Sequence, residues 1–280
     1  MRQQLKVYLL PLSFLLAVTS QAIGRQLGTL TTIDVPGSTY TDLQAINARG
    51  DMVGRYMNGG GTHGFLLSAG QFASIDVPGA TLTFARGINS RGEIVGQYDS
   101  AGVTHGFFLS GGQFASIDFP GASLTLARAI NERGDIVGRY ISGGVTHGFL
   151  LSEGQFTSID FPGASQTLVF GINARDEIVG FYTIAGVNHG LLLSGGSFTT
   201  IDVPVASGTY CGGINDRGDI VGRYDDSAGV SQAFLLSKGS VTRIDVPGAS
   251  FNVGFGINSR GDIVGMYTLA GVGHGFLVSH

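Results

Sequence analysis

Short apolar segments bounded by Gly, Pro and Asn recur along this chain at a fixed interval. The string Ile-Asp-(Val/Phe)-Pro marks each interval, with a spacing of 42 residues four times and then 43. It begins at Ile33, Ile75, Ile117, Ile159, Ile201 and Ile244. Each interval holds four segments rich in Ile, Val, Leu, Phe, Tyr and Thr, which predicts four β-strands per copy. In the third copy these are Leu124–Asn131, Asp135–Tyr140, His147–Ser152 and Gln155–Phe161. No window keeps a 3.6-residue apolar period long enough for a helix.

The residues between the segments predict antiparallel hairpins. The first and second strands are separated by Asn-x-Arg-Gly, as at Asn131–Gly134, which suits a type I turn followed by a left-handed residue. A two-residue link such as Gly111-Gly112 separates the third and fourth strands. A Gly-rich loop of about five residues is expected between the second and third strands. Each copy is therefore expected to form a four-stranded antiparallel meander.

The strands lack clean polar alternation, as in Gly148–Leu151, which is typical of strands with two buried faces. Stacking six such meanders in a closed ring would supply that burial, so the sequence predicts an all-β, six-bladed β-propeller. A β-solenoid is the alternative. With boundaries at Pro-Gly, the blades span about 38–77, 80–119, 122–161, 164–203, 206–246 and 249–280. The last blade then lacks a strand, and we expect the segment 28–36 to close the ring beside Gly275–Ser279.

The N-terminus has the pattern of a signal peptide. Arg2 and Lys6 precede a 12-residue apolar core, and small residues stand before a plausible cleavage after Ala22. Residues 1–22 are therefore expected to be removed, which leaves a single domain, 23–280, exported to the periplasm or the cell exterior with no membrane span. That form carries 14 basic and 20 acidic residues, about −6, without a basic cluster for nucleic acid. The single cysteine, Cys211, is expected to be a small buried side chain.

The repeated string G-I-N-x-R-G-x-I-V-G-x-Y, followed by H-G-F-L, resembles the bacterial HAF-repeat family of predicted extracellular proteins. The resemblance covers all six copies, roughly residues 28–280. The fifth copy departs from it with Gln232-Ala233-Phe234. The family implies export and a propeller-like repeat, but no established activity or substrate.

Four polar residues recur in the copies, and we interpret them as scaffold because a blade needs them in every copy. The Asp before x-Pro-Gly is expected to fix the exit turn, the Asn to build the first hairpin, and the His to donate to the Asp across the hairpin. Gln232 replaces the His once, which disfavours a metal site. The Asp series is Asp34, Asp76, Asp118, Asp160, Asp202 and Asp245; the Asn series is Asn47, Asn89, Asn131, Asn173, Asn215 and Asn258. The Arg series is Arg49, Arg91, Arg133, Arg175, Arg217 and Arg260; the His series is His63, His105, His147, His189 and His274.

Candidate ligand-binding residues lie where the copies differ. One position reads Arg55, Gln97, Arg139, Phe181, Arg223 and Met266. If the arginines at Arg55, Arg139 and Arg223 face the axis, they would form a basic ring for an anion; the alternative is three solvated strand residues. Asp225 and Asp226, on an inserted loop of the fifth copy, would contact a cation or polar ligand, or mark drift in a tolerant loop.

No catalytic motif stands out in the sequence. It has no G-x-S-x-G, H-E-x-x-H, paired-Cys spacing or phosphate loop. Near-identical copies also give their carboxylates alike environments, whereas a glycosidase needs unlike ones. We therefore expect a non-enzymatic binding scaffold for a protein or glycan, with no cofactor and no metal. A hydrolase or lyase with a site at one mouth of the ring, and a passive structural protein of the envelope, are the alternatives.

Overall fold

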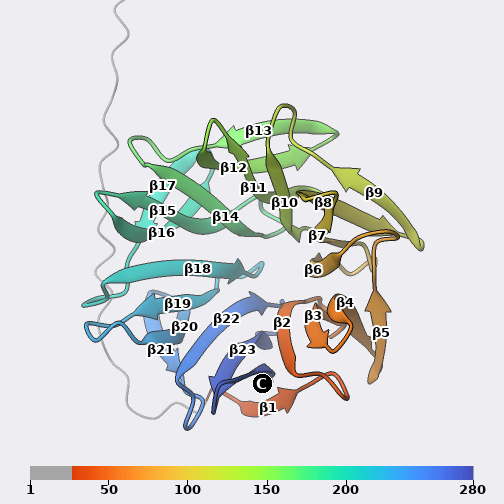
Figure 1. Cartoon of the computed structure of the whole chain (residues 1–280). Coiled ribbons are helices and arrows are strands. Elements are labelled where there is room, and N and C mark those ends of the chain that lie inside the picture. Colours follow the sequence, from red (N-terminus) through yellow and green to blue (C-terminus); the bar gives the residue numbers. More distant parts are fainter. Residues whose placement is uncertain (1–26, 280) are drawn as a thin grey trace, which may run out of the picture.

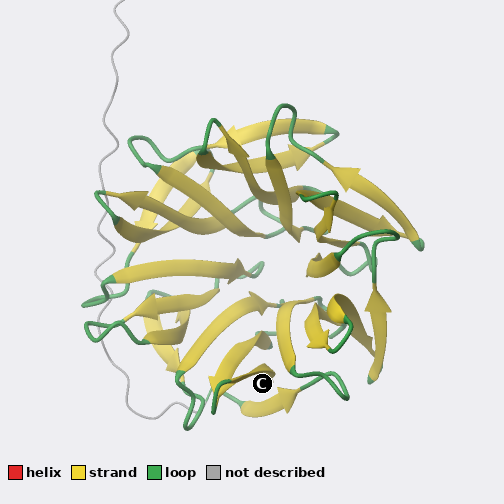
Figure 2. Cartoon of the chain, in the orientation of Figure 1, coloured by secondary structure: helices red, strands yellow, loops and turns green. Residues whose placement is uncertain are grey.

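The computed structural model describes residues 27–279, so the expected signal peptide, 1–22, lies outside the described residues. Those residues form 24 strands and no helix (Figures 1 and 2). The closing segment and first copy give β1 (Thr29–Ile33), β2 (Tyr40–Ile46), β3 (Met52–Asn58), β4 (Gly61–Ser68) and β5 (Gln71–Ile75). The second and third copies give β6 (Leu82–Ile88), β7 (Ile94–Ser100), β8 (Val103–Ser110), β9 (Gln113–Ile117), β10 (Leu124–Ile130), β11 (Ile136–Ser142), β12 (Val145–Ser152) and β13 (Gln155–Ile159).

The second half of the chain repeats the pattern. The fourth and fifth copies give β14 (Gln166–Ile172), β15 (Ile178–Ile184), β16 (Val187–Ser194), β17 (Ser197–Ile201), β18 (Gly208–Ile214), β19 (Ile220–Asp225), β20 (Ser231–Ser237) and β21 (Ser240–Ile244). The sixth gives β22 (Phe251–Ile257), β23 (Ile263–Leu269) and β24 (Val272–Ser279).

Consecutive strands pair antiparallel into meanders, arranged around a common centre (Figure 1). Four separate four-stranded sheets have the orders β10-β11-β12-β13, β14-β15-β16-β17, β18-β19-β20-β21 and β1-β24-β23-β22. The remaining eight strands form one sheet, in which the meanders β2–β5 and β6–β9 are linked by a single parallel pair, Thr62 and Leu82. The solenoid alternative is wrong, because every other strand pair described is antiparallel.

The N-terminal strand completes the C-terminal sheet, as the sequence predicts. β1 lies antiparallel to β24, with Thr29 opposite Ser279 and Ile33 opposite Gly275. Leu30 packs against the apolar cluster shared by the fifth and sixth copies, whereas Ile33 packs against that of the first copy. The closing strand therefore stabilises the seam from both sides.

The turn between the second and third strands is shorter than the sequence led us to expect. β11 ends at Ser142 and β12 begins at Val145, so only Gly143 and Gly144 connect them, not five residues. Both glycines have positive φ, 58° and 81°, the geometry of a two-residue hairpin whose twist matches the strands. Because the turn is this tight, both strands extend further than their apolar residues suggest.

The exit turn at Pro-Gly is held by a threonine, so the expected role of the recurring Asp there is wrong. The Val77 amide donates to Thr83 Oγ1 at 3.0 Å, and equivalent bonds hold four of the other five exits; in the sixth copy Asn252 replaces the threonine and donates to Ile244 O instead. The Asp carboxylate is instead engaged by the histidine. Pro-Gly itself forms a turn in which Ala80 N donates to Val77 O.

In the fifth copy Val205 takes the glycine position with φ 63°, a conformation that a β-branched residue rarely adopts.

The hydrophobic core lies between neighbouring sheets. Phe149, fully buried, packs with Val95 of the preceding copy and Ile136 of its own. Neighbouring sheets approach closely because a glycine in a first strand leaves room: a Cβ on Gly87 would lie 2.9 Å from the Cα atom of Ala129 in the next copy. The same arrangement recurs around the ring and sets the inner strands side by side at its centre.

Candidate functional site

The six recurring asparagines join the copies in a closed ring of hydrogen bonds. Asn47 Nδ2 donates to Asn89 O at 3.1 Å, each asparagine bonds the next in the same way, and Asn258 Nδ2 returns to Asn47 O at 3.2 Å. The Oδ1 atom meanwhile accepts turn amides, as from Arg49 and Asp51 at 2.9 Å. The asparagines therefore build the hairpin, as predicted, and also link neighbouring copies, which the sequence alone did not indicate.

The recurring arginines reinforce this end of the ring. Arg133 Nε donates to Asp135, and its Nη1 donates to Ala174 O of the next copy at 2.9 Å. Burial raises the pKa of the Asp135 carboxyl, but hydrogen bonds from Ser152 and Asn131, with the charge of Arg133, outweigh it and hold that pKa below its usual 3.8. These polar groups are occupied by the scaffold.

The recurring histidines and aspartates pair across the outer hairpin, as expected. His147 Nδ1 lies 2.7 Å from Asp160 Oδ1, and four further pairs have distances of 2.8–2.9 Å. The imidazole also stacks on Tyr140, at 5.0 Å between ring centres. The His147 side chain is 25% exposed and that of Asp160 49%, so the pair is partly solvated.

A narrow channel runs along the inner strands from the asparagine ring. Two small hollows follow one another along it. The first, of about 100 Å³, is lined by the asparagines and by Ile46 and its equivalents, and the second, of about 90 Å³, is lined by the same isoleucines and by Gln44 and its equivalents. Beyond these lies a partly open cavity of about 250 Å³, which we call the central cavity. It lies on the side of the ring away from the asparagines.

The central cavity is lined where the copies differ most. Its inner-strand position reads Gln44, Arg86, Arg128, Phe170, Gly212 and Phe255. Leu168, Phe181, Tyr210, Cys211 and Val253 complete the apolar side, and Arg139 and Arg223 add further charge. Copies one to three thus supply the polar and basic wall, and copies four to six supply most of the apolar wall.

Of the three arginines in the predicted basic ring, two line the cavity. Arg139 and Arg223 do so, whereas Arg55 is not among its lining residues. Arg55 Nε donates to Asp42 at 2.7 Å, and its guanidinium lies over the Phe84 ring. The threefold arrangement is therefore incomplete in the structure.

Arg86 and Arg128 line the cavity and were missed from the sequence. The available signal was the position just before the (Gly/Ala)-Ile-Asn string. This position is Arg in two copies and Gln, Phe or Gly in the others, although the surrounding residues are similar. Asp42, two residues before Gln44, was also missed from the sequence. It holds Arg55 and accepts from Gln44 Nε2 at 3.0 Å. Burial raises the pKa of Tyr40 beside it to about 12.

The two candidate aspartates of the inserted loop serve local structure. Asp225 accepts from Arg223 Nη1 at 2.5 Å and from Ser231 at 2.6 Å, which fixes Arg223 at the cavity wall. Asp226 Oδ1 accepts the amides of Ala228 and Val230, both at 2.9 Å, within its own loop. Asp225 therefore neutralises one cavity arginine, and Asp226 shapes the loop.

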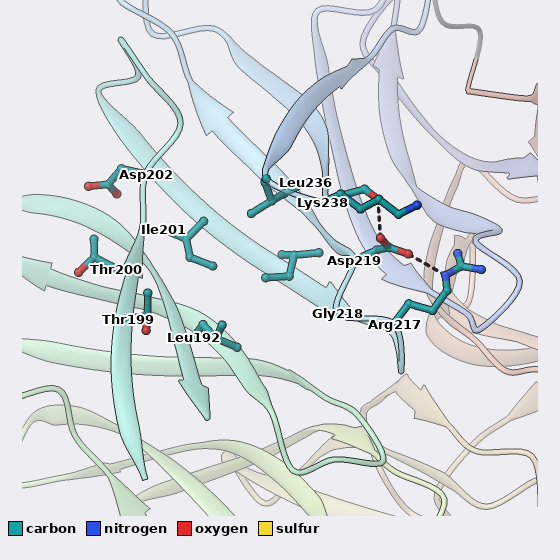
Figure 3. Close-up of a pocket in the computed structure, with 13 residues that line it drawn as sticks. Leu192, Thr199, Thr200, Ile201, Asp202, Arg217, Gly218, Asp219, Leu236 and Lys238 are labelled. Carbon is teal, nitrogen blue, oxygen red and sulfur yellow. Dashed lines mark hydrogen bonds and ion pairs between the residues drawn. The ribbon is translucent and has the colours of Figure 1, made fainter. Parts of the chain in front are cut away.

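A larger hollow of about 630 Å³ lies between the fourth and fifth copies (Figure 3). Leu192 and Thr199 line one side, and Arg217, Asp219 and Lys238 line the other. The Arg217–Asp219 ion pair is the scaffold pair found in other copies, so the hollow has little polar chemistry of its own.

Within residues 27–279, no three His, Cys, Asp or Glu side chains converge as a metal site would require. Among the same residues, no helix is long and apolar enough to cross a membrane. Cys211 is fully buried, and burial raises its pKa to about 12.

No family model matches the chain, and no curated protein matches it. Solved structures do share its architecture. A putative gluconolactonase covers 91% of this chain and 96% of its own, at 12% identity and a TM-score of 0.56. The fold is a β-propeller of four-stranded blades. A lectin from Aleuria aurantia aligns over 85% of this chain and 92% of its own, at 11% identity and a TM-score of 0.54.

A catalytically inactive virginiamycin B lyase from Staphylococcus aureus, with quinupristin, covers 90% of this chain and 99% of its own. It has 10% identity and a TM-score of 0.53. At such low identities these propellers indicate a shared fold alone.

Proposed function

We propose that this protein is an exported, non-enzymatic binding propeller with six blades, whose ligand site is the central cavity. The blade count treats the eight-stranded sheet as two meanders, because a single parallel pair links them. Export rests on the N-terminal sequence and on the resemblance to the HAF-repeat family. The partner expected from the sequence is a protein or a glycan.

The observation that carries the binding role is where the copies diverge. The recurring polar residues are bonded within the scaffold, through the asparagine ring, the Arg–carboxylate pairs and the His–Asp pairs. Charged and aromatic side chains that differ between copies gather in the central cavity. A unique ligand needs unlike surroundings, and within the ring this cavity supplies them.

Enzymes and a lectin share this fold, so fold likeness does not separate catalysis from binding. The binding role is favoured because the acid groups nearest the cavity, Asp42 and Asp225, are each held by an arginine. A general acid or base needs a proton that is free to move to a substrate.

The test uses the purified chain 23–280 against arrays of glycans and envelope proteins, together with lactone and glycoside substrates. Saturable binding without turnover is the expected result. Turnover that is abolished by substitutions in the cavity would overturn the non-enzymatic proposal, and no binding at all would favour a passive structural protein.

A further inference from the structure

Three arginines of the central cavity have no acidic partner among the described residues. Arg86 donates to two neutral amide oxygens, Gln97 Oε1 at 2.8 Å and Gln44 Oε1 at 3.0 Å. Arg128 and Arg139 make no hydrogen bond within residues 27–279, and their Nε atoms are buried and unpaired. The other two arginines of this region, Arg55 and Arg223, are each neutralised by an aspartate. The cavity therefore holds three positive charges that form no ion pair with a carboxylate among the described residues.

This arrangement costs folding free energy unless something compensates it. An arginine keeps its proton in proteins, so burial does not simply neutralise it. Burial lowers the pKa of Arg86 to about 9 and that of Arg128 well below its usual range. The charge of Asp42 raises both pKa values, but burial and the neighbouring arginines outweigh it. An anion that accepts from the unpaired guanidinium groups would relieve the repulsion and satisfy buried donors.

The opposite wall of the cavity is apolar and aromatic. Phe170 lies 5.7 Å from Phe181, and Phe181 meets Tyr210 edge-on at 5.0 Å. The guanidinium of Arg128 lies over the Phe170 ring, 4.8 Å from its centre, where the two walls meet. Leu168, Val253 and Phe255 extend this surface without adding a side-chain hydrogen-bond acceptor. The apolar wall suits a flat or aliphatic body better than a ring of hydroxyl groups, which needs acceptors as well as donors.

We propose that the central cavity binds a small organic carboxylate, with its carboxylate on Arg128, Arg139 and Arg86 and its apolar body against Phe170, Phe181 and Phe255. Planar guanidinium groups bind a carboxylate with paired, charge-assisted hydrogen bonds. A cavity of about 250 Å³ admits a ligand of one ring or a short chain. This inference rests on the proposed function, because it takes the propeller to be a binding protein.

The test is calorimetric titration of the chain 23–280 with phenylacetate, alongside benzyl alcohol, inorganic phosphate and glucuronate. Phenylacetate should bind with one-to-one stoichiometry and raise the melting temperature, since a ligand that binds only the folded state stabilises it. It should bind at least ten-fold more tightly than each of the other three. Equal binding of phosphate would show that the apolar wall does not contribute to binding. Equal binding of benzyl alcohol would show that the arginines do not recognise a carboxylate. Either result would overturn the inference.

Arg128→Met and Arg139→Met should each weaken phenylacetate binding at least ten-fold. Both should also raise the melting temperature of the unliganded protein, because each removes an unpaired buried charge and keeps the apolar stem. Arg243→Met is the matched control: Arg243 is half exposed and paired with Asp245, so binding should not change. Unchanged binding in Arg128→Met would overturn the site.

The array experiment separates this inference from the proposed function. If a glycan or protein binds equally well to the chain and to Arg128→Met while phenylacetate does not bind, the carboxylate site is wrong and the binding role stands. If nothing binds in either experiment, both are wrong.

Discussion

His274 Nδ1 lies 2.8 Å from a carboxylate oxygen of Asp34, a residue 240 positions earlier in the chain. The pair repeats, across the seam between the chain ends, the His–Asp contact made within single blades elsewhere. It sits beside the β1–β24 ladder, which places Thr31 opposite Leu277.

Deleting residues 23–37 should destabilise the whole ring and not merely fray one end. The deletion exposes the edge of β24 and removes Leu30 and Ile33 from two apolar clusters. We expect one cooperative transition whose melting temperature falls by roughly 10 °C or more, measured by calorimetry. His274→Ala is the control, and should cost only about 0–1 kcal/mol because the pair is partly solvated. Loss of amide protection confined to the sheet of β1, β24, β23 and β22 would contradict this prediction.

Asn131→Ala should lower the free energy of unfolding. Asn131 is 4% exposed, accepts from the Arg133 amide of its own turn and donates to Asn173 O of the next copy. Leaving buried amides and a carbonyl unpaired should cost about 1–3 kcal/mol in chemical denaturation. Asn131→Asp keeps an oxygen for the turn amides but loses the donor to Asn173 O and to Asp135 Oδ2, and it places a second carboxylate beside Asp135, so this variant should also lose stability. A loss below about 0.5 kcal/mol for both would show that the ring of asparagines contributes little.

Val205→Gly should stabilise the protein. Val205 has φ 63° and is 95% exposed, so the substitution relieves backbone strain without removing a core contact. The left-handed conformation costs a non-glycine residue about 1–2 kcal/mol, partly offset by the greater freedom of glycine in the unfolded chain. A gain of about 1 kcal/mol in urea unfolding is expected, and the matched reverse change, Gly163→Val at φ 81°, should be destabilising. Two changes of the same sign would contradict the strain argument.

The free energy of unfolding should fall in acid because the carboxylates that accept hydrogen bonds from the recurring asparagines and arginines become protonated. Hydrogen bonds and arginine charges outweigh burial and hold the pKa values of Asp51, Asp135 and Asp219 below 3.8, and that of Glu93 below 4.5. A depressed carboxyl pKa gives stability that is fully present above the unfolded value and is lost as pH falls through the folded value. These groups should leave the melting temperature unchanged between pH 7 and 5 and lower it below about pH 4.5. Asp135→Asn should show a shallower acid slope; an unchanged slope would contradict the assignment.

Cys211 should be unreactive in the folded protein. It is fully buried, and a pKa raised to about 12 keeps the thiol protonated at neutral pH. Iodoacetamide should label it only after unfolding, as followed by mass spectrometry. Rapid labelling under native conditions would mean that the cavity wall opens around it.

The sequence predicted the strands, the meanders and the closing pair because each depends on a local pattern repeated in every copy. Counting strands alone was enough to place the segment that holds Ile33 beside the segment that begins at Gly275. The loop between the second and third strands was overestimated, because Gly143 and Gly144 allow a tighter turn than their composition suggests. The exit turn was assigned to the wrong side chain because Asp76 and Thr83 both lie near it in the sequence. The residue pattern does not show that Thr83, six positions after Val77, is the one that accepts from the Val77 amide.

The candidate site was predicted only in part. Arg139 and Arg223 lie at the cavity because strand alternation fixes the side on which they project. The sequence could not indicate that Asp42 neutralises Arg55, because that ion pair depends on the register between two strands. Arg86 and Arg128 were missed because they lie within a first strand, and the sequence alone does not show that this position faces the centre of the ring.

The pairing of β1 with β24 also has a consequence for biosynthesis. β1 is the first described strand to leave the ribosome, and its partner is the last, so the ladder between them waits for nearly the whole chain. Until then the blades made earlier form an open arc with an unpaired strand at one end and a bare edge at the other. A chain truncated by premature termination before β24 leaves β1 without its partner and one edge of β23 exposed. Such a chain is a substrate for proteases and chaperones rather than a smaller propeller.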